Sequence, residues 1–285
     1  MKCAIVIPCH NEAHFIGKTL ASLISQTRLP NTIVVVDDQS TDDSAQIITS
    51  YTETYDYIKL IQITSSDEHL PGSKVIQAFQ KGFATLNQDF DIICKFDADL
   101  IFPDNYLERI VAIFTENPQV GMAGGFCYIE KEHDWVLENL TNKDHIRGAL
   151  KAYKKPCFKA IGGLKPAMGW DTIDEILAQY HGWHIQTDTS LKVKHLKPTG
   201  NTYNPNTKYK QGAAFYRMRY GWLLSCIAAA KLAKRKGKLH FFKNYIKGYY
   251  RASQQKLPFL LSKEEGQFLR KLRWDGIKRK VFLKS

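Results

Sequence analysis

The chain has 285 residues, of which 44% are hydrophobic, enough for one large α/β domain or for a domain with an appendage. Its net charge of +12 is unevenly distributed. Basic residues outnumber acidic ones by 21 to 3 from residue 200 onward, whereas acidic residues outnumber basic ones by 25 to 19 before it. The acidic first part argues against a broad nucleic-acid surface there and is compatible with carboxylates around a cation.

The cysteines and the apolar runs indicate a cytoplasmic protein. The six cysteines have no Cys-x-x-Cys spacing, so we expect reduced, structural thiols. The apolar run at the N-terminus is far shorter than that of a secretory signal. The longest later run, 221–233, is interrupted by Ser225 and Lys231 and falls short of the roughly 20 residues that span a bilayer. We therefore expect no export and no unaided membrane crossing.

Strand and helix patterns alternate along the first half of the chain. The apolar run Cys3–Pro8 is typical of a strand buried on both faces, and a helix with apolar spacing follows Asn11. Further strands are predicted at 32–37, 58–64 and 91–96, and further helices at 40–51, 73–86 and 103–117. The helix at 40–51 is expected to start with a capping box at Ser40. This alternation predicts an α/β fold with a mostly parallel central sheet flanked by helices.

Polar side chains follow three of these strands. Because ligands bind beyond the carboxyl ends of parallel strands, these side chains are candidate site residues. In extended backbone Asp97 and Asp99 project to the same side, which suits joint binding of one cation or one ribose–phosphate unit. A turn stabilised by aspartate hydrogen bonds is the alternative. The three clusters are His10-Asn11-Glu12, Asp37-Asp38 and Asp97-Ala98-Asp99.

The order and spacing of these segments resemble the family 2 glycosyltransferases with the GT-A fold, over roughly residues 1–200. The resemblance implies an inverting transfer from a UDP- or GDP-linked sugar, with Mn²⁺ or Mg²⁺ as cofactor. In the first segment it implies that Pro8, Asn11 and Glu12 contact the nucleotide sugar. The matching segments are Val6-Ile7-Pro8-Cys9-His10-Asn11-Glu12, Asp37-Asp38-Gln39-Ser40-Thr41-Asp42 and Lys95-Phe96-Asp97-Ala98-Asp99.

The resemblance gives separate roles to the acidic clusters. Asp37 or Asp38 matches the residue that contacts the nucleotide base. Asp97 is expected to contact the ribose, and Asp99 to bind the metal. Lys74, in Gly72-Ser73-Lys74, resembles the lysine of the family's GxK segment, which lies near the nucleotide; a solvated residue at a helix start is the alternative.

Two later segments also resemble the family. The turn at 161–164 resembles its acceptor-side glycine turn, where the absence of a side chain at Gly163 lets the backbone approach the sugar. A simple tight turn is the alternative. His195 lies in 193–200, which resembles the closing segment whose histidine completes the metal shell. A neutral imidazole beside carboxylate and diphosphate oxygens suits Mn²⁺ or Mg²⁺, although a lone histidine is more often structural.

Asp171 is the expected catalytic base. It matches the aspartate of the family's Glu-Asp pair, and Gly182 follows at the family's usual spacing. In that role Asp171 would deprotonate the acceptor hydroxyl. Trp170 stands where the family usually has Glu, which puts the acceptor pocket in doubt. A helix cap is the alternative for Asp171, and nearby carboxylates compete with it for the role: Asp174 and Glu175.

Residues 201–285 are predicted to form a basic, amphipathic, helical extension of a catalytic domain at 1–200. Helices are expected at Tyr209–Arg235 and His240–Ser253. A positive, partly apolar surface would attract anionic lipids, which suggests peripheral attachment to the inner membrane face near a lipid-linked or glycan acceptor. A helical cap with a solvated basic face is the alternative.

We therefore expect transfer of a single sugar in cell-envelope or surface-glycan synthesis. Processive members of the family carry a Gln-x-x-Arg-Trp motif, which the segment 211–215 does not match. A sugar-phosphate nucleotidyltransferase is the nearest alternative, but no Gly-rich, basic phosphate loop follows the first strand. A non-catalytic protein that binds membranes or nucleic acid is the second alternative. The intact acidic set argues against it, and no nucleic acid is expected.

Overall fold

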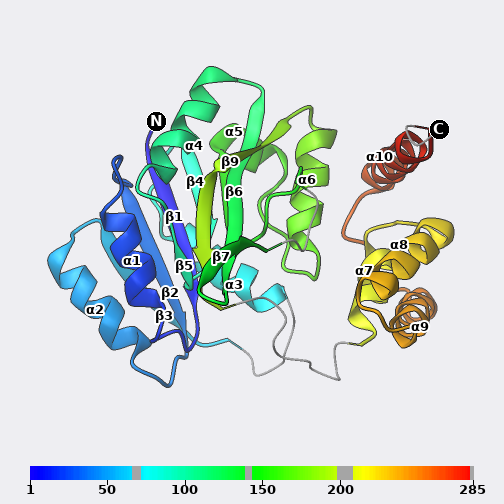
Figure 1. Ribbon diagram of the computed structural model, residues 1–285, viewed down its shortest axis with the longest axis horizontal. Helices are drawn as coiled ribbons and strands as arrows, with labels where there is room; N and C mark the ends of the chain where they lie inside the picture. The colour runs from blue at the N-terminus through cyan, green and yellow to red at the C-terminus, as the bar shows by residue number, and fades with distance from the viewer. Residues whose placement is uncertain (66–71, 139–142, 198–207, 283–285) are drawn as a thin grey trace.

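One sheet of nine strands forms the centre of the molecule, with helices on its flanks (Figure 1). The computed structural model describes residues 1–65, 72–138, 143–197 and 208–282. The strand order is β3-β2-β1-β4-β8-β6-β9-β5, and β7 pairs with β6. The strands are β1 Cys3–Cys9, β2 Thr32–Asp38, β3 Ile58–Ile63, β4 Ile92–Phe96, β5 Leu100–Ile101, β6 Val120–Lys131, β7 Asp134–Leu137, β8 Leu150–Lys154 and β9 His184–His195.

The first four strands form the parallel part of the sheet, and they confirm the four strands predicted from the apolar runs. β1 lies between β2 and β4, and β3 continues the sheet beyond β2. Each residue of β1 and of β4 is buried, as expected for strands that are covered on both faces. All three strands β1, β2 and β4 therefore carry their polar residues to the same edge, beyond their carboxyl ends.

The second half of the sheet is mixed. β8 runs antiparallel to both β4 and β6, whereas β9 is parallel to β6 and antiparallel to β5. The pairing of β5 with β9 aligns Leu100 with His195. A residue late in the chain is thereby placed beside the segment between β4 and β5, which carries Asp97 and Asp99.

The helices connect the strands, and their bounds agree with the predicted ones to within a few residues except at two starts. The start predicted at Asn11 is wrong, because α1 begins at Ile16 and Asn11 lies before it with a φ angle of 52°. The capping box predicted at Ser40 is wrong, because the helix starts at Ser44 and the Ser40 hydroxyl accepts a hydrogen bond from the Asn11 backbone N–H at 2.9 Å instead. The helices that lie among the strands are α1 Ile16–Ile24, α2 Ser44–Thr54, α3 Ser73–Ala84, α4 Tyr106–Glu116, α5 Lys155–Ala160 and α6 Trp170–Tyr180.

Four helices follow the sheet: α7 Lys210–Arg217, α8 Trp222–Arg235, α9 His240–Gln254 and α10 Lys263–Phe282. The prediction for α9 is confirmed, but the single helix predicted over Tyr209–Arg235 is wrong. The chain turns between α7 and α8, where Arg219 and Gly221 have φ angles of 58° and 74°, which an α-helix excludes. Two contacts hold this turn, since Arg219 Nε donates to Leu261 O and Arg270 donates to Arg219 O, both at 2.7 Å.

These four helices lie on the side of the molecule that carries α6, and α10 contacts α6 (Figure 1). Lys165 Nζ donates to Leu260 O at 2.7 Å, and the rings of Tyr180 and Phe268 meet edge to face at 5.6 Å. Leu269 of α10 is fully buried in the common core. Among the described residues, no helix combines the length and apolar character that a bilayer-spanning segment needs. The predicted domain boundary at 200/201 lies outside the described residues.

The buried position of Leu269 gives a test of this packing. Leu269→Ala should lower the free energy of unfolding by about 2–5 kcal/mol, because it opens a cavity between α10 and its neighbours. Leu239→Ala is the matched control, since Leu239 is 85% exposed and its truncation should change stability by no more than about 0.5 kcal/mol. Urea denaturation of both variants measures the difference. Equal stabilities would contradict the packing of α10.

Candidate functional site

A cleft of about 1080 Å³ lies at the carboxyl ends of β1, β2 and β4. This volume is sufficient for a nucleotide sugar. Both faces of the cleft carry ionisable side chains that come from distant parts of the sequence. The lining segments are Pro8–His10 with Glu12, Asp38 and Gln39, Thr41, Ser65, Gly72, Lys74 and Val75, Ala78, Lys95, Asp97–Asp99, Arg147–Ala149 and Met168–Asp171.

Asp97 and Asp99 both line this cleft, as their spacing predicts. The Asp97 backbone N–H donates to Ala149 O at 2.8 Å, and its carboxylate pairs with Lys95, which is buried at the end of β4. Asp99 is 8% exposed, and its Oδ1 has no hydrogen-bond partner among the described residues. A buried carboxylate oxygen without a partner costs free energy, so this atom fits a cation ligand.

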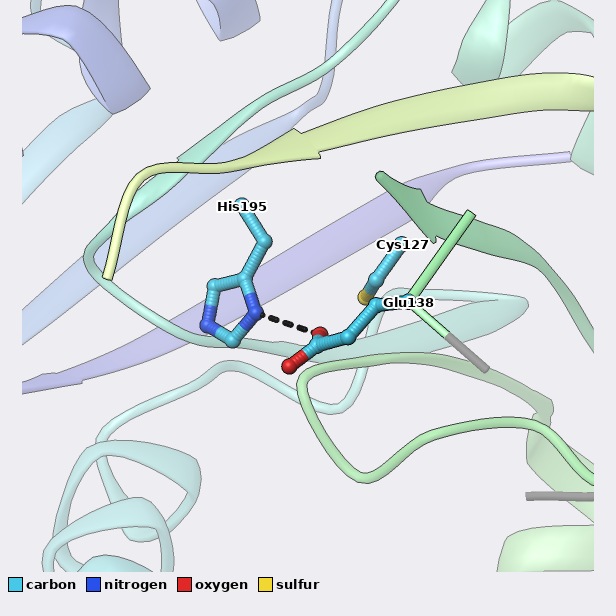
Figure 2. A group of neighbouring side chains, drawn as sticks. All are labelled: Cys127, Glu138 and His195. Atoms are coloured by element: carbon cyan, nitrogen blue, oxygen red, sulfur yellow. Dashed lines mark hydrogen bonds and ion pairs between the residues drawn. The ribbon is translucent and has the colours of Figure 1, made fainter. Parts of the chain in front are cut away.

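The Asp99 carboxylate faces His195, which the β5–β9 pairing brings to it. His195 Nε2 lies 3.4 Å from Asp99 Oδ2, while Nδ1 donates to Glu138 Oε2 at 2.9 Å (Figure 2). Burial lowers the pKa of His195, but the hydrogen bonds and charges of Asp99 and Glu138 outweigh it and raise the pKa to about 9. The Asp99 carboxylate and the His195 imidazole, with a cation in place of the proton on Nε2, are donors that suit Mn²⁺ or Mg²⁺.

Glu12 adds a further carboxylate at the mouth of this acidic group. Burial raises its pKa, Lys197 lowers it through a hydrogen bond and its charge, and Asp99 and Asp97 raise it. Lys197 Nζ donates to Glu12 Oε1 at 2.8 Å, whereas Glu12 Oε2 is buried without a partner in the described part of the chain. The proximity of these acidic groups is the condition under which a divalent cation binds strongly.

The structure distinguishes between the two aspartates that follow β2. Asp38 lines the cleft and accepts a hydrogen bond from the Ser65 backbone N–H at 3.1 Å. Asp37 is buried behind the cleft, and it accepts a hydrogen bond from the Ser40 backbone N–H at 3.3 Å. Of the two, Asp38 is therefore positioned to contact a nucleotide.

The other predicted nucleotide-sugar residues divide into two groups. Pro8, Glu12 and Lys74 line the cleft, but Asn11 and Gly163 are not among its lining residues. Asn11 Oδ1 accepts the Thr41 backbone N–H at 2.7 Å and so organises the loop after β2. Gly163 lies in the turn that ends α5, where its N–H donates to Phe158 O at 3.0 Å.

Asp171 lies in the first turn of α6, at the opposite wall of the cleft. His145 Nε2 lies 3.6 Å from Asp171 Oδ2, and His145 Nδ1 donates to Glu175 Oε2 at 2.8 Å. Burial raises the pKa of Asp171, but the hydrogen bond of His145 and the charges of Lys151 and His145 outweigh it and hold the pKa below its ordinary value. The carboxylate is therefore ionised at neutral pH.

The carboxylates that compete with Asp171 are directed away from the cleft. Lys151 is fully buried, and its ammonium lies 2.8 and 3.0 Å from the Asp174 oxygens and 3.2 Å from Glu175. Tyr153 also donates to Asp174 at 2.5 Å. Burial lowers the pKa of Lys151, but the charges of Asp174 and Glu175 raise it by more than burial lowers it. Lys151 therefore stays charged. This buried network positions α6, and of its acidic residues only Asp171 lines the cleft in the described structure.

Trp170, the departure from the family pattern, lines the cleft but is mostly buried. Its ring is faced by the ammonium groups of Lys95 at 5.3 Å and Lys151 at 5.7 Å. Gly148 makes room for the ring, because a Cβ there would lie 2.7 Å from Trp170 Cζ2. Trp170 thus joins the two buried lysines through its π face.

Several residues that complete the site were not predicted from the sequence. Lys95 was detectable as a charge inside the apolar run of β4. Arg147, which lines the cleft, and Glu138, which binds both Arg147 and His195, lie in segments without a motif or a periodic pattern. His145 likewise has no local sequence signal.

Comparisons with known proteins agree with this geometry. Residues 4–163 match the model of the Glycosyl transferase family 2. Over 170 residues the chain is 32% identical to an uncharacterised glycosyltransferase of Nostoc sp., and the match covers 58% of this chain and 50% of that protein. The chain therefore spans about half the length of this relative.

Two solved structures have a similar fold. Staphylococcus aureus TarS in complex with UDP-GlcNAc has a TM-score of 0.58 and 17% identity, covering 79% of this chain and 66% of that one. The Pyrobaculum calidifontis mannosyltransferase in complex with GDP-Man and Mn²⁺ has a TM-score of 0.59 and 16% identity, covering 97% and 80%. These similarities identify the α/β fold as the GT-A type.

The raised pKa of His145 predicts a pH-dependent stability. Interactions with Asp171 and Glu175 outweigh burial and raise the pKa from 6.5 to about 9, a difference of about 3 kcal/mol. This stabilisation is fully present below pH 6.5 and is lost as the pH rises through about 9. His145→Gln should therefore lose less stability than the wild type between pH 6.5 and 9.5, as measured by urea denaturation. The exposed His14→Gln is the control, and an unchanged pH dependence in His145→Gln would contradict the interaction.

Proposed function

The chain belongs to glycosyl transferase family 2, and from this premise we propose that it transfers a single sugar, with inversion, from a UDP- or GDP-linked donor to a hydroxyl group. The observation that carries this proposal is one cleft that holds Asp38, Asp97 and Asp99 on one wall and Asp171 on the other. We further propose an acceptor in cell-envelope or surface-glycan synthesis.

The donor wall would bind the nucleotide and its diphosphate. Asp38 is available to accept hydrogen bonds from the base, and Asp97 lies beside it for the ribose. Asp99 and His195 would hold Mn²⁺ or Mg²⁺, which when bound stabilises the charge on the leaving diphosphate. Lys74, Lys95 and Arg147 add positive side chains to the same cleft. The donor and its leaving group would therefore be bound chiefly by this wall.

The acceptor wall would supply the base. Asp171 is ionised at neutral pH because His145 and Lys151 lower its pKa, so it is ready to accept the proton of an acceptor hydroxyl. The oxygen would then attack the anomeric carbon from the side opposite the diphosphate, which inverts the configuration. Because the acceptor oxygen would displace the diphosphate directly, the reaction needs no covalent intermediate.

Two aspartate variants test these roles. Asp99→Asn should reduce Mn²⁺-dependent nucleotide release from a panel of UDP- and GDP-sugars by at least about 100-fold, because it removes a cation ligand. Asp171→Asn should reduce release about 100-fold or more, because it removes the base, while donor binding measured by calorimetry persists. Asp56→Asn, an exposed aspartate outside the cleft, is the control. Full activity in either site variant would overturn its assigned role.

We also propose that the protein is cytoplasmic and that its extension binds the anionic inner face of the membrane, near a lipid-linked or glycan acceptor. Large apolar side chains are exposed on neighbouring helices, with Trp222 53%, Leu223 61% and Tyr250 58% exposed. Basic side chains lie close together in the same extension. Burial lowers the pKa of Lys231, and the positive charges of Lys280, Arg235 and Arg273 nearby lower it further. This combination of apolar and positive groups suits an anionic lipid surface.

Vesicle flotation tests the membrane contact. The wild type should float with vesicles that contain phosphatidylglycerol and remain unbound with neutral vesicles, and added salt should release it. Substitution of both Trp222 and Leu223 by Ser should reduce binding about 10-fold or more, since two inserted apolar side chains are lost. Leu29→Ser, on the catalytic domain, removes an equally accessible leucine and is the control. Equal flotation of the double variant would contradict the proposal.

A further inference from the structure

Three buried side chains from the mixed half of the sheet form a cluster. Cys127 of β6, Glu138 after β7 and His195 at the end of β9 place their ligand atoms within 4.8 Å of one another (Figure 2). The Glu138 backbone N–H donates to Cys127 O at 2.9 Å, which fixes the acidic residue against β6. Glu138 Oε2 accepts hydrogen bonds from both His195 and Arg147.

This cluster is a poor metal site of its own. The guanidinium of Arg147 already pairs with Glu138 Oε2, and a cation bound there would repel it. A cysteine sulfur is a soft ligand that favours zinc or copper over the oxygen-preferring Mn²⁺ and Mg²⁺. The chemistry of the cluster is therefore that of a support for neighbouring groups.

We propose that Glu138 is a positioning residue that aims His195 at the cation site and holds Arg147 at the cleft. This inference rests on the proposed role of Asp99 and His195 as cation ligands. Glu138 is 6% exposed and follows directly on β7, so its carboxylate is fixed by the sheet. Its two partners bind the same oxygen and come from different later parts of the chain, one before β8 and one at the end of β9.

The hydrogen bond to Glu138 determines which nitrogen of His195 can bind a cation. A carboxylate only accepts hydrogen bonds, so Glu138 keeps the proton on Nδ1, and Nε2, which faces Asp99, is the nitrogen whose proton a cation would replace. Nε2 is the atom that lies 3.4 Å from Asp99 Oδ2, on the side of the unpartnered Oδ1. Carboxylates that orient ligating histidines in this way raise metal affinity 10- to 100-fold.

The same carboxylate also holds Arg147 in place. Arg147 lines the cleft together with Asp97 and Asp99, where a donor diphosphate would lie. A guanidinium fixed at this place would offer paired N–H donors to phosphate oxygens. Glu138 therefore couples the geometry of the cation site to that of the arginine, although it does not line the cleft in the described structure.

Binding of Mn²⁺ tests this role without an activity measurement. We expect Glu138→Gln, folded as judged by circular dichroism, to bind Mn²⁺ 10- to 100-fold more weakly than the wild type in electron paramagnetic resonance titrations with UDP and, separately, with GDP. Cys127→Ala is the control from the same cluster, and it should bind Mn²⁺ within about 2-fold of the wild type, since Cys127 supports neither His195 nor Arg147 by a hydrogen bond. Spin-echo modulation should show imidazole nitrogen coupled to Mn²⁺ in the wild type and a weakened coupling in Glu138→Gln.

The outcomes separate this inference from the proposed function. Wild-type Mn²⁺ affinity and nitrogen coupling in Glu138→Gln, together with weakened binding in His195→Ala, would overturn the role of Glu138 and leave the cation site intact. Unchanged binding in His195→Ala would overturn the cation-site assignment and the role of Glu138 with it. Glu138→Asp, which keeps the charge but shortens the side chain, replaces Glu138→Gln if that variant does not fold. It should also weaken both Mn²⁺ affinity and the coupling, and wild-type values would again overturn the role.

Discussion

Mutual repulsion of carboxylates in a poorly solvated cleft is the constraint on which the rest of this structure depends. A buried charge is tolerated only when a partner compensates it. Most carboxylates have such a partner, and except for Lys95 the partner lies in a distant part of the chain. The pairs are Lys95 with Asp97, Lys197 with Glu12, Arg147 with Glu138, and Lys151 with Asp174 and Glu175. Asp99 has no lysine or arginine partner among the described residues, and Asp99 and Glu12 each keep one buried oxygen without a partner there, so these two oxygens are the ones that a cation could satisfy.

The topology of the sheet explains how these partners meet. The parallel half brings the ends of β1, β2 and β4 to one edge, so that the acidic residues after them converge. The mixed half brings the counterparts, because β9 returns beside β5 and ends at His195, next to Asp99. Neither half forms the site alone. Asp38, Asp97 and Asp99 belong to the first half of the chain, whereas Arg147, Asp171 and His195 belong to the second.

The parallel half of the sheet could be predicted from the sequence, whereas much of the mixed half could not. β1 to β4 are predictable because buried parallel strands are continuous apolar runs, and the residues after them follow as candidates. Asp38 and Asp37 are adjacent, and only the three-dimensional path of the loop decides which one faces the cleft. Glu138 and His145 act through partners that are distant in sequence, so no local pattern reveals them. The turn at Arg219 was also hidden, because contacts with Leu261 and Arg270 stabilise its backbone.

The two walls of the cleft differ in how closely they follow the family. The family match ends at residue 163, so it includes the donor wall but neither Asp171 nor His195. The acceptor wall has Trp170 in place of the usual acidic residue, and it is supported by the extension, where Met218 approaches Gly169. A Cβ at Gly169 would lie 3.4 Å from the Met218 methyl carbon, so α7 directly supports the segment that carries Asp171. If Asp171 acts as proposed, acceptor choice should depend on the extension as well as on the cleft, and donor binding chiefly on the sheet.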